Sequence, residues 1–251
     1  MAPGGGSCQR LGGENVENLT ILAAASGVVA VAKPAGLPTQ AVRGIPSVEA
    51  WARAELVQPP GAGYLGVPHR LDRAVSGVLL LATTPRAARK LSRQFERRQV
   101  RKTYLAVVAN PPGPAPGVPE SAAEWRDLVA KLPDEPRAAI VAEGSGGREA
   151  VTLARLRARI ELAGAARLVL ELQPLTGRMH QLRLQAAVRG MPVVGDCLYG
   201  GPALAGNAAA DGDSREAPIL LHAWSIAYAD PDTGAAVEVI APLPPHWPAV
   251  I

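Results

Sequence analysis

The chain has 251 residues, of which 48% are hydrophobic and 19% are charged, with a formal net charge of +4. This balance is typical of a globular protein with a substantial core and excludes a disordered or fibrous chain, while two cysteines outside any CxxC pair, Cys8 and Cys197, argue against a disulfide framework or a cysteine-based zinc site. With no apolar run of membrane-spanning length and no signal-peptide pattern at the start, the sequence predicts a cytoplasmic protein with no membrane partner.

The first third of the chain predicts two short buried strands around one helix. Residues 27–33, GVVAVAK, form an apolar run that Pro34 ends, which indicates a strand. Ser47 is a suitable N-cap for a helix over 48–57, with its apolar residues on one face. The run GVLLLA, residues 77–82, predicts a second buried strand.

A strongly basic helix is predicted next. Thr84 is a good N-cap and Pro85 fits the first turn, while Ala87, Ala88, Leu91 and Phe95 recur at helical spacing and should face the core. Basic residues dominate the rest of this region, against the single acid Glu96. They are Arg86, Arg89, Lys90, Arg93, Arg97, Arg98, Arg101 and Lys102. Such a cluster is typical of a surface that binds a phosphate backbone, and the alternative is a solvated helix face.

The remainder of the chain is rich in strands. Residues 102–109 alternate like a strand, with Tyr104, Ala106 and Val108 on one side, whereas 120–150 show no assignable pattern. The later predictions are paired strands at 151–162 and 166–174 (the first with a helix as its alternative), a helix over 179–190 ended by Gly190, a flexible loop at 203–217, and strands at 220–229 and 235–243. This succession indicates an α+β fold.

The stretch VPHRLDRAVSGVLLLA, residues 67–82, places charged side chains directly before a buried strand. In an extended backbone Arg70 and Asp72 project to one side, while His69 and Leu71 project to the other. Leu71 is then able to anchor the loop to the core and leave Asp72 facing a cleft. The alternative is a purely structural Asp–Arg pair at the end of the strand.

A second charged group lies on the helix predicted in TGRMHQLRLQAAVRG, residues 176–190. His180 and Arg183 are three residues apart and share a helical face, so Arg183 is a candidate partner for Asp72. The alternative is again structural, with His180 as a core histidine and Arg183 as a surface charge.

Several motifs, in this order along the chain, resemble the RluA family of pseudouridine synthases. They are VVAVAKPAGL, HRLD with SGVLLLA, KTYLAVV, LTGRMHQLRLQ with GMPVVGDCLYG, and LHAWSIAYADPDTGAAVEVIAPLP. The resemblance covers roughly residues 19–248. It implies an α+β pseudouridine synthase fold, with a largely antiparallel mixed sheet, flanking helices and loops, and a central catalytic cleft.

The resemblance also implies a reaction, the isomerisation of uridine in RNA to pseudouridine without any cofactor. By the family pattern Asp72 is the catalytic acid, Tyr104 is the tyrosine of KxY, and Arg183 pairs with Asp72. Arg70 is expected to help expel the target base or hold its place, and the other expected substrate contacts are His69, Leu71, Arg178, His180 and Gln181. These roles are physically reasonable, because a nearby arginine favours an ionised carboxylate and an aromatic ring offers a flipped uracil a stacking surface. The eight basic residues of 86–102 are then expected to contact the RNA backbone.

The family pattern is not followed everywhere. Val75 stands where threonine is usual, Gln185 where histidine is common, and Met191 replaces the histidine of GHP.

We expect a flexible segment at 1–18 and one catalytic domain over 19–251, without the S4 domain of many relatives. The protein is predicted to be a monomer that acts on structured RNA, either rRNA or tRNA. The alternatives are a non-catalytic RNA-binding or RNA-folding protein on the same scaffold, and an unrelated hydrolase, for which the chain has no GxSxG, paired-carboxylate or metal motif.

Overall fold

The computed structural model describes residues 19–40, 45–57, 59, 63–111, 122–204 and 217–248. The predicted segment 1–18 and most of the predicted loop 203–217 lie outside the described residues. The strands are β1 (Ile21–Ala25), β2 (Val28–Lys33), β3 (Ser76–Ala82), β4 (Arg101–Ala109), β5 (Ala123–Lys131), β6 (Ala138–Ile140), β7 (Arg148–Leu162), β8 (Ala165–Pro174), β9 (Leu221–Ala229) and β10 (Ala236–Ile240). The helices are α1 (Val48–Glu55), α2 (Pro85–Glu96), α3 (Gln181–Ala187) and the 3-10 helix η1 (Cys197–Tyr199).

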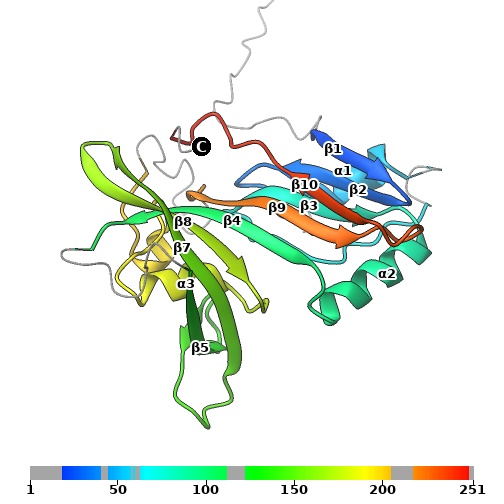
Figure 1. Cartoon of the computed structure of the whole chain (residues 1–251). Helices are drawn as coiled ribbons and strands as arrows, with labels where there is room; N and C mark the ends of the chain where they lie inside the picture. Colours follow the sequence, from blue (N-terminus) through cyan, green and yellow to red (C-terminus); the bar gives the residue numbers. More distant parts are fainter. Residues whose placement is uncertain are drawn as a thin grey trace, which may run out of the picture.

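One ten-stranded sheet organises the fold, in the order β1-β2-β3-β9-β4-β8-β7-β5-β6, with β10 also paired to β9. Every pairing is antiparallel except the short parallel contact between β3 and β9. Figure 1 shows α2 beside the β1–β3 end of the sheet and α3 beside the β5–β7 end. The predicted α+β fold with a largely antiparallel mixed sheet is therefore confirmed.

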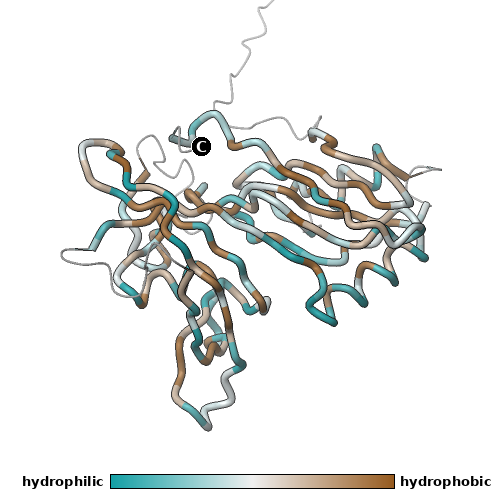
Figure 2. The backbone as a smooth tube through the Cα atoms, in the orientation of Figure 1, coloured by the Kyte–Doolittle hydropathy of each residue, from teal (hydrophilic) through white to brown (hydrophobic). Residues whose placement is uncertain are grey.

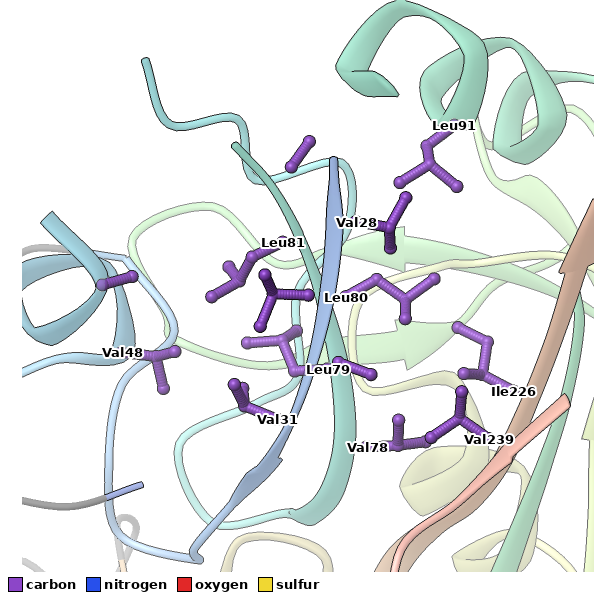
Figure 3. Close-up of a cluster of buried hydrophobic side chains, with 14 of the residues drawn as sticks. Val28, Val31, Val48, Val78, Leu79, Leu80, Leu81, Leu91, Ile226 and Val239 are labelled. Atoms are coloured by element: carbon purple, nitrogen blue, oxygen red, sulfur yellow. The ribbon is translucent and has the colours of Figure 1, made fainter. Parts of the chain in front are cut away.

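The first core lies around β3, all seven residues of which are buried. Figure 3 shows Val48 of α1 on one side of β2 and β3 and Leu91 of α2 on the other. Both helices begin where their caps predicted, because Ser47 Oγ accepts the N–H of Ala50 at 3.1 Å and Thr84 Oγ1 accepts the N–H of Ala87 at 3.2 Å. The predicted apolar face of α2 packs into this core, which leaves its basic residues outside.

A second core lies on one face of β4, β8 and β7, under α3. Tyr104, Ala106 and Val108 face it together, as the alternation predicted, while Leu105 and Val107 pack in a separate cluster on the other face. Residues 151–162 lie in strand β7 and do not form the alternative helix. The unassigned stretch 120–150 contains β5, β6 and the start of β7.

The helix predicted over 179–190 is shorter than expected. It begins only at Gln181, because His180 has a left-handed backbone with φ of 51°. Its last turn closes through the bonds from Gly190 N–H to Ala187 O at 2.9 Å and from Met191 N–H to Ala186 O at 3.0 Å, with Gly190 at φ of 73°. Strand β1 was not predicted. In the part of the chain that the structure describes, no helix has the length and apolarity needed to cross a bilayer.

Candidate active site

The loop that carries Asp72 is fixed by contacts of the residues just before it. His69 Nε2 accepts the backbone N–H of Leu80 at 2.9 Å, and its ring stacks on Phe95 with centroids 4.7 Å apart. The backbone N–H of Leu71 donates to Thr39 Oγ1 at 3.1 Å, and the same hydroxyl donates back to Leu71 O at 2.9 Å. Asp72 itself keeps 36% of its side chain exposed. The loop therefore holds a reachable carboxylate in a fixed place.

Lys33, at the end of β2, links the loop of Asp72 to the loop that follows β2 through hydrogen bonds. Its ammonium donates to the carbonyls of Pro34 at 2.9 Å, Leu37 at 2.7 Å and Arg73 at 3.2 Å, and the residue is 1% exposed. Burial lowers the pKa of Lys33 to about 7, although the charge of Asp72 acts in the opposite direction. The sequence reasoning missed Lys33 and Thr39. A lysine that ends an apolar strand just before proline was the available signal.

Arg183 reaches Asp72 from α3, as predicted. Its Nη1 lies 3.6 Å from Asp72 Oδ2. Its main partner is a residue that the sequence reasoning missed, Asp196, whose carboxylate accepts Nε–H and Nη2–H at 2.7 Å each. The side chains of Arg183 and Asp196 are only 4% and 0% exposed, so the alternative of a surface arginine is wrong. Burial lowers the pKa of Arg183, but the hydrogen bonds and charge of Asp196 outweigh it and raise that pKa.

His180 completes the group around Asp72. Its Nε2 lies 3.8 Å from Asp72 Oδ2, and its Nδ1 lies 2.9 Å from the hydroxyl of Tyr199. The Tyr199 ring meets the His180 ring edge-on and lies 5.3 Å from the Arg183 guanidinium carbon. Both Asp196 and Tyr199 come from GDCLYG, so the acid and the aromatic residue of that motif were the signal for these two positions.

Tyr104 is half-buried on β4, beside a narrow hollow that has no room for a water molecule. Burial and the charge of Asp72 both raise the pKa of its hydroxyl, which is neutral at physiological pH. The hollow is lined by His69, Val78, Lys102, Tyr104, Ala223, Ser225 and Ile226. Lys102 is half-buried here and burial lowers its pKa, so it does not belong to the exposed basic surface that the sequence predicted for it.

The other seven predicted RNA-backbone residues are exposed along α2, the turn that follows it and the first residue of β4. They are Arg86, Arg89, Lys90, Arg93, Arg97, Arg98 and Arg101. Figure 2 shows that much of α2 is hydrophilic, whereas the strands beside it mix hydrophobic and hydrophilic residues. Arg86 lies 3.2 Å from Asp232, so part of its charge is compensated within the chain. The predicted cluster is therefore a genuine surface of positive charge.

Two of the predicted substrate contacts serve the fold instead. Gln181 is 4% exposed, and its amide is fully used: Oε1 accepts from Thr176 and Arg178, and Nε2 donates to Val151 and Thr152. Leu71 is 6% exposed and packs in the first core. A buried residue with no free polar atom has nothing to offer a substrate.

The remaining predicted substrate contacts, Arg178 and Arg70, differ in whether other residues of the chain hold their side chains. Arg178 Nε donates to the carbonyl of Glu149 at 2.9 Å, which restrains that side chain. Arg70 is exposed and makes no hydrogen bond or ion pair within the described ranges. Arg70 is therefore available to a ligand.

The three departures from the family pattern are buried away from solvent. Val75 and Met191 pack in the second core. Gln185 Oε1 accepts from Thr152 Oγ1 at 2.6 Å, and its Nε2 donates to Asp127 Oδ2 at 2.7 Å. All three positions thus act through packing or internal hydrogen bonds.

Comparisons with known proteins place the chain in one enzyme family. Residues 27–188 match the family model described as RNA pseudouridylate synthase. The chain is 34% identical, over 90% of its length, to the ribosomal large subunit pseudouridine synthase D of Xanthomonas campestris, and 33% identical, over 69% of its length, to the dual-specificity RNA pseudouridine synthase RluA of Escherichia coli. It spans 66% and 71% of those two proteins. The human RNA pseudouridylate synthase domain containing 1 superposes with a TM-score of 0.68 at 27% identity, covering 97% of this chain and 87% of that one.

Proposed function

The chain belongs to the RluA family of RNA pseudouridine synthases, enzymes that isomerise uridine in RNA to pseudouridine, and we propose that Asp72 is the catalytic residue of this isomerisation. The observation that supports this role is the environment of its carboxylate. Asp72 is 36% exposed on a pinned loop, with Arg183 Nη1 at 3.6 Å and His180 Nε2 at 3.8 Å on the protein side. Oδ2 of the carboxylate thus faces Arg183 and His180, while the exposed part of the side chain is open to a ligand.

The reaction is an internal rearrangement. The bond between uracil N1 and ribose C1′ breaks, a bond between C5 and C1′ forms, the C5 proton leaves and N1 gains a proton. No oxidant or second substrate is consumed. Each possible first step, attack on the sugar, attack on the ring or removal of a proton, uses the same ionised carboxylate. The Asp72 carboxylate lies beside the buried guanidinium of Arg183.

The target base must leave its stack to reach Asp72. We infer that Tyr104 stacks on the extruded uracil and that the free side chain of Arg70 occupies the space the base leaves. The exposed arginines of α2 bind the phosphate backbone without reading sequence. One curated relative is named for the large ribosomal subunit and another for dual specificity. We therefore propose rRNA or tRNA as the substrate.

A non-catalytic RNA-binding protein would keep the basic surface of α2 but would not require Arg183 and His180 to lie beside Asp72. The close approach of Arg183 and His180 to one oxygen of Asp72 favours the enzyme. The test is tritium release from RNA labelled at uridine C5. We expect Asp72→Asn to bind RNA with the affinity of the unsubstituted chain and to release no tritium.

Asp134→Asn is the matched control, because Asp134 is an exposed acid between β5 and β6 whose left-handed backbone, with φ of 58°, asparagine also tolerates. It should release tritium at the original rate. Tritium release by Asp72→Asn at the original rate would contradict the proposed role. RNA binding without tritium release from any cellular RNA, by the unsubstituted protein, would favour the binding protein.

A further inference from the structure

Arg183 and His180 approach the same oxygen of Asp72. Arg183 Nη1 and His180 Nε2 lie 3.6 Å and 3.8 Å from Oδ2. Within the described parts of the chain, no hydrogen bond or ion pair reaches Oδ1. Hydrogen bonds between catalytic groups are often long without substrate and shorten when it binds. Two donors that converge on one oxygen therefore indicate that both would form hydrogen bonds to this oxygen once RNA is bound. The two carboxylate oxygens are thus inequivalent before any RNA arrives.

The hydrogen bonds behind His180 decide which of its nitrogens carries the proton. The backbone N–H of Ala138 donates to the Tyr199 hydroxyl at 3.0 Å. The hydroxyl hydrogen then has two acceptors, His180 Nδ1 at 2.9 Å and Ala138 O at 3.4 Å. The shorter bond is the better one. With Nδ1 as acceptor, the neutral imidazole carries its hydrogen on Nε2 and presents an N–H to Asp72.

The opposite tautomer is electrostatically poor. It would turn the Nε2 lone pair toward the carboxylate of Asp72 and leave the hydrogen of the Tyr199 hydroxyl with only the 3.4 Å bond to Ala138 O. The charged groups that act on His180 are Asp72, Arg183 and Asp196. Burial and the charge of Arg183 lower the pKa of His180, and they outweigh the two carboxylates, which raise it. The ring is therefore neutral at physiological pH.

We propose that His180 is a positioning residue for Asp72, with Tyr199 fixing its tautomer, so that His180 and Arg183 hold Oδ2 and Oδ1 is the oxygen that meets the target nucleotide. This proposal rests on the proposed catalytic role of Asp72. It also replaces the sequence-based prediction of His180 as a substrate contact. The left-handed backbone of His180 serves the same end, because it starts α3 with the imidazole beside Arg183 and Asp72.

The first test is kinetic and uses Tyr199→Phe, which removes the hydroxyl and keeps the ring under Arg183. We expect the single-turnover rate at saturating RNA to fall by up to about tenfold, the scale of one hydrogen bond between neutral groups. The dissociation constant for RNA should stay within about twofold, because Tyr199 does not meet the RNA in this scheme. Tyr228→Phe, at a buried tyrosine of β9, is the matched control and should keep the original rate.

The pH dependence provides a readout that a change in packing alone would not move. In the unsubstituted protein, protonation of Nδ1 must displace the hydrogen bond from Tyr199. Tyr199→Phe removes this hydrogen bond, so Nδ1 is easier to protonate. The acid limb of the plot of rate against pH should therefore move to higher pH. His180→Asn, which tolerates the left-handed backbone but cannot span the same distance, should lose at least as much rate as Tyr199→Phe.

Nitrogen-15 NMR of the histidines tests the tautomer without RNA. We expect His180, assigned by its loss in His180→Asn, to be the Nε2–H tautomer, to become a mixture in Tyr199→Phe and to be unchanged in Tyr228→Phe. An Nδ1–H tautomer, or a full single-turnover rate in Tyr199→Phe, would overturn the proposal. An inactive Asp72→Asn in the same experiment would show that the proposed function still stands, whereas an active one would show that the catalytic role itself is wrong.

Discussion

The substitution Asp196→Asn probes the ion pair beneath the candidate active site. The Asp196 carboxylate is fully buried and accepts two hydrogen bonds of 2.7 Å from Arg183, itself 4% exposed. Breaking a buried pair by removing one partner costs about 3–5 kcal/mol, because the other charge stays buried without compensation. Asparagine retains one acceptor oxygen, and Asp72 lies 3.6 Å from the same guanidinium, so we expect the lower end, about 3 kcal/mol.

For a chain of this size such a loss lowers the melting temperature by about 6–12 °C. Urea unfolding followed by circular dichroism measures the free energy directly. The single-turnover rate should also fall, because the released guanidinium closes on Asp72 and turns it from its resting position. The control is Asp127→Asn, which weakens the more exposed pair with Arg189 at 3.0 Å and should cost less stability and no rate. An unfolding free energy within about 1 kcal/mol of the original, with an unchanged rate, would refute this reasoning.

Two further predictions concern RNA affinity and pH. Replacing Arg89 and Arg93 together by alanine should weaken RNA binding and reduce the slope of log affinity against log salt by about 0.7–0.9 for each phosphate that the protein no longer neutralises, while Arg53→Ala on α1 should leave both unchanged. Burial lowers the pKa of His222 from 6.5 to about 4, so the unfolded chain binds a proton that the folded chain resists, and stability should fall as the pH drops from about 6.5 to about 4. His222→Gln should flatten this fall by about 1.4 kcal/mol per pH unit in urea titrations; an unchanged slope would show that another group causes it.

Local signals were sufficient where one short segment decides its own structure. The caps Ser47 and Thr84 placed the starts of α1 and α2, because an N-cap satisfies backbone donors only three residues away. The alternation around Tyr104 predicted the correct faces of β4. The helix at 179–190 was predicted too long, because the left-handed turn at His180 is held by contacts with Asp72 and Tyr199, which come from distant parts of the sequence.

The sequence by itself determined the chemistry available to this protein: the acid of HRLD, the arginine of HQLR and a basic helix with an apolar inner face. Only the tertiary structure decided how the charges are shared. Arg183 donates from Nε and Nη2 to Asp196 and directs Nη1 toward Asp72, while the amide of Gln181 is used in hydrogen bonds that stabilise the fold. The physical reason is that burial forces every polar group to find a partner, and which partner lies within about 3 Å depends on how β4, β7, α3 and η1 pack together.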